Sequence, residues 1–347
     1  MAPHGSAGKR RLRGPIGQVA ISRGSRVKTL YKGLVGDIGG TNARLAMVDE
    51  DGHLRHPKTY ATKDYGSLTE IVATYLETAM GRKRPERVVL AVAGPLVDGE
   101  IELTNIDWRI SEGELVGAFE FEKVRLLNDF GAQALAAPHL PADSLRRIGP
   151  DLRPSPTCPI VVVGAGTGFG VAGLVHSDRG DLVLQAEGGH ASFAPSDDVE
   201  IEIFRILKAR FGRVSIERIL SGAGMVDLYA ALCELAGETP HLTTAQAITT
   251  SKDAQALATV ARFCAILGSV AGDIALTYGA RGGVYIAGGI APQIQDPLMQ
   301  GDFRARFEAK GRMSSYMADI PTTLITHPYA ALVGAARALD QTSSDLL

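Results

Sequence analysis

Two glycine-rich turns are the residues of the sequence whose types and spacing most clearly suggest chemistry. The first reads Gly-Asp-Ile-Gly-Gly-Thr-Asn over residues 36–42 and follows a short apolar run. Because glycine has no Cβ, backbone N–H groups in such a turn can approach phosphate oxygens closely. The turn therefore predicts a phosphate site, and the alternative is a structural hairpin with a solvated aspartate. The candidate nucleotide-binding residues here are Gly36, Asp37, Ile38, Gly39, Gly40 and Thr41.

Asp37 adds a carboxylate to the first turn, at the end of the apolar run. A carboxylate in that place can hold Mg²⁺, usually through water, beside a phosphoryl group that is being transferred. Asp37 is accordingly the candidate magnesium residue.

The second turn reads Gly-Ala-Gly-Thr-Gly-Phe-Gly over residues 164–170. It does not match the dinucleotide-binding fingerprint, because Phe169 takes the place of the third glycine and a strand, not a helix, is expected to follow. Gly166, Thr167 and Gly168 can instead surround a β- or γ-phosphate with N–H groups and a hydroxyl. The alternative is a plain glycine-rich hairpin.

Asn128 and Asp129 form an informative pair at the end of a predicted strand, residues 124–127. A carboxylate at the end of a buried strand can accept the proton of a substrate hydroxyl as that oxygen attacks a phosphate. The Asn128 amide can donate to and accept from sugar hydroxyls. The competing explanation is that the pair caps a helix that starts at Phe130.

Further hydroxyl acceptors follow along the chain. Residues 187–190 read Glu-Gly-Gly-His, so that a carboxylate could accept two adjacent sugar hydroxyls and an imidazole a third. Glu217, within Ser-Ile-Glu-Arg-Ile-Leu-Ser-Gly, is another candidate. Taken alone, either glutamate is more often a surface charge.

The elements around these residues form a repeated pattern. Strand–glycine turn–strand occurs over residues 33–49 and again over residues 160–176, and each copy is followed by helices and a further strand. Asp51-Gly52 is a hairpin signal that leads into a third strand from His53 to Tyr60. The repetition predicts an internal duplication, and 347 residues are enough for two domains.

Other elements follow from hydrophobic periodicity and turn signals. A helix is predicted at Ser111–Ala118, with Glu114 placed for a capping box. Residues 199–278 are predicted to be mainly helical. The remaining predictions are helices at Ser67–Met80, Phe130–Pro138 and Tyr329–Leu339 and strands at Arg87–Ala93, Glu100–Leu103 and Gly283–Ala287.

Composition excludes several classes of protein. The net charge of −2 is unsuited to coating nucleic acid, and three cysteines without a CxxC pair indicate neither a zinc site nor a disulfide scaffold. The longest uninterrupted apolar runs, such as Val88–Gly94 and Ile160–Val163, are too short to cross a bilayer. We expect a cytoplasmic protein.

The first 36 residues carry eight basic side chains and no acidic one. We expect residues 1–31 to form a disordered tail. An organelle transit segment, an over-long translation start and a nucleic-acid-binding arm are the alternatives.

The motifs taken together resemble the bacterial glucokinase family, within the hexokinase, actin and Hsp70 superfamily. They are, in order, GDIGGTN, LTNIDW, LLNDF, GAGTGFG, EGGH, SIERILSG and AGGI, and they run from about Leu34 to Leu339. The resemblance implies an α/β fold of the two-domain actin-like ATPase (ribonuclease H-like) class with a central cleft. It implies a small domain at 32–139 plus 332–347 and a larger one at 140–331. The activity implied is transfer of the ATP γ-phosphate to the 6-hydroxyl of glucose, with Mg²⁺.

The resemblance also assigns roles residue by residue. The nucleotide loop falls on Gly36–Thr41, the adenosine motif on Gly288 and Gly289, and the catalytic base on Asp129. The implied sugar contacts are Asn105, Asn128, Asp129, Glu187, His190 and Glu217.

Some expectations depend on the branch of the family. The related repressor–open reading frame–kinase group carries a cysteine-rich zinc motif near its EGGH-like segment, whereas this chain has no cysteine between Cys158 and Cys233 and so resembles the zinc-free branch. A homodimer is expected from the family alone. Another hexose and a polyphosphate donor remain open. A non-catalytic sugar sensor would need a DNA-binding module, which the residues before Lys32 do not suggest.

Overall fold

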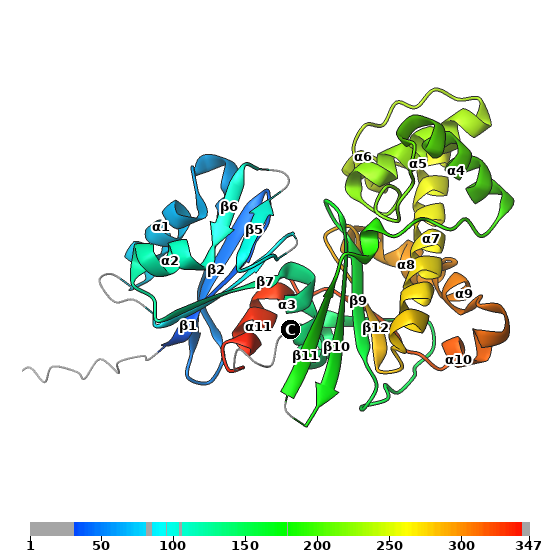
Figure 1. Cartoon of the computed structure of the whole chain (residues 1–347). Helices are drawn as coiled ribbons and strands as arrows, with labels where there is room; N and C mark the ends of the chain where they lie inside the picture. Colours follow the sequence, from blue (N-terminus) through cyan, green and yellow to red (C-terminus); the bar gives the residue numbers. More distant parts are fainter. Residues whose placement is uncertain (1–30, 81–84, 95, 104–105, 179, 342–347) are drawn as a thin grey trace, which may run out of the picture. The chain divides into compact units, whose positions relative to one another are not determined.

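A computed structural model describes residues 31–341 apart from 81–84, 95, 104–105 and 179 (Figure 1). Tyr31–Leu347 forms one compact unit. The predicted basic tail, residues 1–31, lies outside the described residues except for Tyr31, where the first strand begins.

The first sheet contains the first glycine turn. Its order is β3-β2-β1-β4-β7, with β1 antiparallel to β2 and parallel to β4, and with β4 parallel to β7. The glycine turn connects β1 to β2, as predicted. The strands are β1 (Tyr31–Ile38), β2 (Asn42–Asp49), β3 (Leu54–Ala61), β4 (Arg87–Val92) and β7 (Lys123–Asn128).

The second sheet has the order β11-β10-β9-β12-β13-β8. Its first five strands repeat the order and directions of the first sheet, and β8 adds an antiparallel edge. The predicted duplication is therefore confirmed in the topology. The strands are β8 (Leu145–Ile148), β9 (Ile160–Ala165), β10 (Phe169–Ser177), β11 (Gly180–Ala186), β12 (Gly283–Ala287) and β13 (Thr322–Ile325).

Helices and a small ribbon complete the fold. The ribbon pairs β5 (Glu100–Leu103) with β6 (Trp108–Ser111). The helices are α1 (Leu68–Met80), α2 (Glu112–Phe119), α3 (Asp129–Ala136), α4 (Asp198–Phe211), α5 (Gly222–Ala236), α6 (Ala245–Thr250), α7 (Ala254–Tyr278), α8 (Gln295–Gln300), α9 (Phe303–Glu308), α10 (Ser314–Ala318) and α11 (Ala330–Ala338). Single 3₁₀ turns are η1 (Thr62–Asp64), η2 (Ala137–His139), η3 (Ala142–Ser144), η4 (Gly188–His190), η5 (Ala291–Ile294) and η6 (Gly311–Met313).

One predicted cap is wrong. Ser111 occupies the N-cap position of α2, but its side chain makes no capping hydrogen bond. Glu114, expected to complete a capping box, instead accepts a hydrogen bond from Thr69 Oγ1 on α1 at 3.0 Å. Glu114 therefore links α1 to α2 and does not cap the N-terminus of α2.

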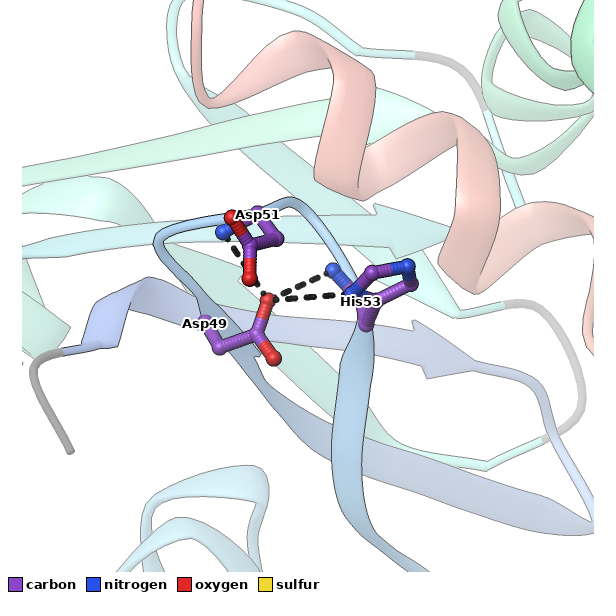
Figure 2. Close-up of side chains that lie close together, drawn as sticks. All are labelled: Asp49, Asp51 and His53. Atoms are coloured by element: carbon purple, nitrogen blue, oxygen red, sulfur yellow. Dashed lines mark hydrogen bonds and ion pairs between the residues drawn. The ribbon is translucent and has the colours of Figure 1, made fainter.

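The β2–β3 hairpin forms at the predicted Asp51-Gly52 signal (Figure 2). Asp49 Oδ1 accepts from the backbone N–H groups of Asp51 at 3.1 Å and His53 at 2.8 Å, and Oδ2 accepts from Arg55 Nε at 2.7 Å. The His53 N–H, as the largest cause, and the Arg55 guanidinium lower the pKa of Asp49. The side chains of Asp49, Asp51 and His53 thus lie close together because Asp49 binds the backbone of the turn that contains the other two.

Helix α7 lies in the region predicted to be mainly helical. It is strongly apolar over most of its length, although it contains no long uninterrupted apolar run. Its 25 residues include an 18-residue window of mean hydropathy 1.5, long and apolar enough by composition to cross a membrane. However, 72% of that window is buried in the protein, where α7 packs against α5 and α9. The helix therefore has the burial of the core helix of a globular protein.

Helices α3 and α11 cross closely, and both contact the first sheet. A Cβ added to Gly334 of α11 would lie 1.7 Å from the carbonyl oxygen of Ala132 on α3, so only glycine permits this approach. The apolar cluster around the crossing contains Val35 and Val89 of the first sheet together with Ala172 of the second. Helix α3, which starts at Asp129, is therefore packed against both sheets.

Candidate active site

The first glycine turn is shaped by a buried threonine. Thr62 in η1 is 2% exposed; its Oγ1 donates to the Gly40 carbonyl at 2.7 Å and its N–H to the Thr41 carbonyl at 3.0 Å. In a trans peptide the C=O and the following N–H point in opposite directions. Because the Gly40 carbonyl points at Thr62, the Thr41 N–H points away from it. Thr62 thus fixes the direction of a backbone donor in the predicted phosphate turn.

Asp37 is paired with an arginine on the neighbouring strand. Asp37 and Arg44 are register partners in the β1–β2 pair, and Arg44 Nη1 lies 2.9 Å from Asp37 Oδ2. Burial raises the pKa of Asp37, and the Arg44 charge and hydrogen bond oppose that rise. The site therefore contains a largely buried carboxylate next to a cation.

Two residues predicted for the nucleotide loop have packing roles. The position of a Cβ on Gly36 lies 2.6 Å from Leu90 Cδ2 and 2.8 Å from Leu45 Cδ2, so these leucines fill the space over the strand. The Ile38 side chain is fully buried in the core of the first sheet. For Gly36 and Ile38 a role in nucleotide binding stays a prediction, as it does for Gly39, Gly40 and Thr41 in the turn itself.

The second glycine turn is held by Glu217. Glu217 Oε2 accepts the Phe169 N–H at 2.8 Å, and a Cβ on Gly168 would lie only 2.4 Å from that same oxygen. On the other side, the Gly166 carbonyl accepts the Gly222 N–H at 2.8 Å. Gly168 is therefore required by the carboxylate that lies against the turn. Thr167 is exposed at its tip.

The segment containing Glu217 also binds the Glu-Gly-Gly-His segment. The Glu217 N–H donates to the Gly189 carbonyl at 2.9 Å. Within η4 and its cap, His190 Nε2 and Glu187 Oε2 are 4.0 Å apart, and both side chains are more than half exposed. The structure thus brings three predicted sugar contacts, Glu187, His190 and Glu217, into one continuous region beside the second turn.

Gly288 and Gly289, the predicted adenosine motif, follow β12 directly and also reach the second turn. Gly288 has φ of 84°, which favours glycine. The position of a Cβ on Gly166 lies 3.9 Å from the Gly289 N. Since β9 and β12 are parallel neighbours, their carboxyl ends meet at one edge of the sheet.

Asn128 is a helix cap. Its Oδ1 accepts from the backbone N–H groups of Phe130 at 2.9 Å and Gly131 at 3.1 Å, and its Nδ2 donates to the Gly94 carbonyl at 3.1 Å. The capping alternative is therefore confirmed for Asn128, and α3 starts at Asp129, one residue before the predicted start. The Gly94 contact uses one of the two amide N–H groups, so a sugar contact by Asn128 stays a prediction.

Asp129 is a carboxyl group with a strongly raised pKa. Its pKa is raised to about 7, first by burial, then by the charge of Asp37 and, to a smaller extent, that of Glu187. The Phe130 N–H, 2.9 Å from Asp129 Oδ1, opposes the rise. The structure therefore places two other predicted site acids, Asp37 and Glu187, within electrostatic range of Asp129. A carboxyl with this pKa can take up a proton near neutral pH.

Sequence reasoning missed Arg44 and Thr62. Arg44 could have been found by counting register across the turn, because it lies as far after Gly40-Thr41 as Asp37 lies before. No local signal distinguishes Thr62 from other threonines that follow a strand. Asn105, predicted as a sugar contact, lies outside the described residues.

Comparisons with known proteins agree with this arrangement. The Glucokinase family model matches residues 34–342. The glucokinase of Caulobacter sp. (strain K31) is 52% identical over 321 residues, which cover 91% of this chain and 97% of the relative. A crystal structure of a glucokinase from an Antarctic psychrotroph is 39% identical, with a TM-score of 0.79 over 89% of this chain and 98% of that one.

A more distant neighbour is a ROK-family glucokinase from Streptomyces griseus in complex with glucose and AMPPNP. It is 19% identical, with a TM-score of 0.60 over 88% of this chain and 98% of that one. At this identity the likeness shows the fold alone, and the fold is the two-domain actin-like ATPase class that the motifs predicted. The chain therefore belongs to the glucokinase family and is a hexose kinase.

Proposed function

We propose that the chain transfers the γ-phosphoryl group of ATP to the 6-hydroxyl of glucose, giving glucose 6-phosphate and ADP in the cytoplasm. The observation that carries this proposal is Asp129, a half-buried carboxyl group whose pKa is raised to about 7 by desolvation and by the charges of Asp37 and Glu187. The glucokinase relatives support the substrate pair. The Streptomyces griseus neighbour contains glucose and an ATP analogue.

The sugar is held by the region around η4. Glu187, His190 and Glu217 present two carboxylates and an imidazole, which suit a set of adjacent hydroxyls. Asn105 and Asn128 are the remaining sugar contacts that we propose. Glu217 already accepts the Phe169 N–H through Oε2, so its other oxygen is the one offered to the sugar.

Asp129 acts as the general base. Its carboxylate accepts the proton of the 6-hydroxyl as that oxygen forms a bond to the γ-phosphorus. The bond between the γ-phosphorus and the β,γ-bridging oxygen breaks, and ADP leaves with the electron pair. The backbone N–H groups of residues 39–41, with Gly166, Thr167 and Gly168, stabilise charge on the phosphoryl oxygens. Gly288 and Gly289 border the adenosine.

The residues present fit a magnesium ion. Asp37 and Asp129 offer hard oxygen donors, and the influence of Asp37 on the pKa of Asp129 shows excess negative charge there. We propose that Asp37 holds the ion through water, while its Oδ2 keeps Arg44. When bound, Mg²⁺ would neutralise the phosphate charge.

We also propose a division into two domains that close on the sugar, with residues 32–139 and 332–347 in the smaller and 140–331 in the larger. Closure would exclude water and limit ATP hydrolysis. The functional unit that we propose is a homodimer.

The test is a coupled assay of glucose phosphorylation, run with ATP and separately with polyphosphate. Asp129→Ala should lose at least about 100-fold in kcat, because general-base catalysis typically supplies 10²–10⁴. Circular dichroism establishes that the variant is folded. Near-normal turnover in a folded Asp129→Ala enzyme would falsify the mechanism. A panel of hexoses compared by kcat/KM decides whether glucose is the preferred acceptor.

A further inference from the structure

The last glycine of the second turn motif, Gly170, faces a large aromatic side chain. Gly170 is the second residue of β10, beyond the turn itself. A Cβ built on Gly170 would lie 1.9 Å from Phe130 Cδ2 and 2.1 Å from Cε2, so the ring rests directly on the backbone of β10. Phe130 is only 8% exposed. No side chain larger than hydrogen fits at residue 170 while the ring is there.

Phe130 is also the residue whose backbone holds the proposed base. Its N–H donates to Asp129 Oδ1 and to Asn128 Oδ1, each at 2.9 Å. The ring on β10 and the amide at the carboxylate are therefore parts of one residue. Because Phe130 is packed in the apolar cluster around the crossing of α3 and α11, pushing its ring away from β10 should move the start of α3, and with it that amide and the carboxylate.

Other contacts at the start of α3 involve the same face of the second sheet. The position of a Cβ on Gly131 lies 3.2 Å from Val183 Cγ1 on β11, and the Asn128 N–H donates to Gln185 Oε1 at 3.2 Å. Asn128 itself ends β7 of the first sheet. Asp129 thus follows directly on β7 of the first sheet, at the place where the start of α3 contacts β10 and β11 of the second sheet.

We propose that the Phe130 ring, seated on Gly170, is a positioning contact that sets the Asp129 carboxylate relative to the second glycine turn. Gly170 then serves Asp129 and not a phosphate. This inference rests on the proposed role of Asp129 as the base. A displacement of about 1 Å in a catalytic group can cost roughly 100-fold in rate, so even a modest shift of the ring should be measurable.

The test combines substitutions on the two sides of the contact. Gly170→Ala inserts a methyl group where the ring lies, and should lower kcat about 100-fold while the KM values for glucose and ATP change less than about threefold. Phe130→Ala alone should lower kcat about tenfold. The Gly170→Ala/Phe130→Ala double variant removes the clash, and should recover kcat at least about tenfold over Gly170→Ala, a non-additivity expected of residues in contact.

Gly173 provides a matched control on the same strand. Three residues along β10 it faces the opposite side, where a Cβ would lie 2.7 Å from Tyr278 Cε1 of α7. Gly173→Ala also overlaps with an aromatic ring, less severely than at Gly170, but away from α3. It should lower the melting temperature as Gly170→Ala does, yet keep kcat within about threefold of wild type, because overpacking alone costs stability.

The outcomes separate the two proposals. A folded Gly170→Ala enzyme with kcat near wild type, or a double variant no better than Gly170→Ala, overturns the positioning contact. If Gly170→Ala does not fold, Phe130→Ala decides: a tenfold lower kcat supports the contact, and an unchanged kcat overturns it. Asp129→Asn is measured in parallel. If it keeps wild-type turnover, the base assignment fails, whatever the glycine variants show.

Discussion

The two glycine turns occupy equivalent places in duplicated sheets, yet they are held by different chemistry. In the first sheet, a neutral hydroxyl and amide of Thr62 bind the turn carbonyls, and a carboxylate, Asp37, stands at the end of the preceding strand beside Arg44. In the second sheet, the turn N–H at Phe169 is bound by the carboxylate of Glu217. The two halves thus share a topology but differ at the turn. In the first half Thr62 fixes the direction of a backbone N–H donor, and in the second half the carboxylate of Glu217 lies against the turn.

The difference shows how a duplicated unit acquires two functions. Strand order and turn position are common to both halves, whereas the residues that bind each turn come from outside the repeated unit, from η1 in the first and from residues 215–222 in the second. Among the residues that hold the two turns, we expect variants in the first half to change kcat or the KM for ATP, and variants of Glu217 in the second half to change mainly the KM for glucose.

The largest expected effect comes from Asp129→Asn, which should reduce kcat about 1000-fold because the base is removed. In the wild type, kcat should rise with pH through about 7 and then level off, since Asp129 must be ionised. Initial rates from pH 5.5 to 9 measure this limb. A wild-type kcat that does not change over that range would contradict the assignment.

The same substitution should stabilise the protein at alkaline pH. The folded pKa of Asp129, about 7, is above the unfolded value of 3.8, so the folded protein loses stability as pH rises between these values. Asparagine carries no charge and avoids this loss. The melting temperature of Asp129→Asn should exceed that of wild type by a few degrees at pH 8, as a gain of about 1 kcal/mol would give, and the excess should shrink toward pH 4. An equal difference at both pH values would be inconsistent with this pKa.

In the second half, Glu217→Gln should raise the KM for glucose about 30-fold, in the range expected for losing a hydrogen bond to a charged group. The amide oxygen can still accept the Phe169 N–H, so the turn is kept and kcat should fall less than the affinity. Steady-state kinetics with varied glucose measure the split. A larger loss in kcat than in affinity would break the comparison.

Arg44→Lys is expected to have an intermediate effect in the first half. Lysine keeps the charge beside Asp37 but lacks the planar guanidinium, and kcat should fall about tenfold, or about 1.4 kcal/mol. The matched control is Arg55→Lys, which changes another arginine–aspartate pair of this sheet, at Asp49. Arg55→Lys should leave kinetics unchanged; equal losses in both variants would remove Arg44 from the site.

The smallest effect is expected for Thr62→Val, which leaves the Gly40 carbonyl without its hydroxyl donor. An unsatisfied acceptor costs about 1–3 kcal/mol when fully buried, and the cost should be near the lower end here because this hydrogen bond is only part-buried. Part of that cost should appear as a KM for ATP raised about fivefold, because the direction of the Thr41 N–H is no longer fixed. Thr62→Ser keeps the hydroxyl and should behave as wild type. Identical KM values in the valine and serine variants would leave Thr62 a purely structural residue.

Most of the sheet framework could be predicted from the sequence, since apolar runs bounded by glycine clusters define β1, β2, β4, β9 and β12. Strands β8 and β13 are four residues each, like the predicted β5, but their sequences LRRI and TTLI do not alternate polar and apolar residues as EIEL does in β5, so no periodicity indicates them. The site motifs could be predicted because each consists of consecutive residues in the sequence. The bonds that hold them, such as Thr62 to Gly40 and Glu217 to Phe169, join residues 22 and 48 positions apart, and only folding brings these together.

The crossing of α11 over α3 has a consequence for synthesis. The strands of the first sheet are complete in sequence by Asn128, but α11, which covers part of that sheet beside β1 and β4, begins only at Ala330. While the ribosome is making the intervening 200 or so residues, Val35 and Val89 lack this apolar cover. We therefore expect the first half not to complete its folding independently during translation, and nascent chains that stall before residue 330 to depend on chaperones.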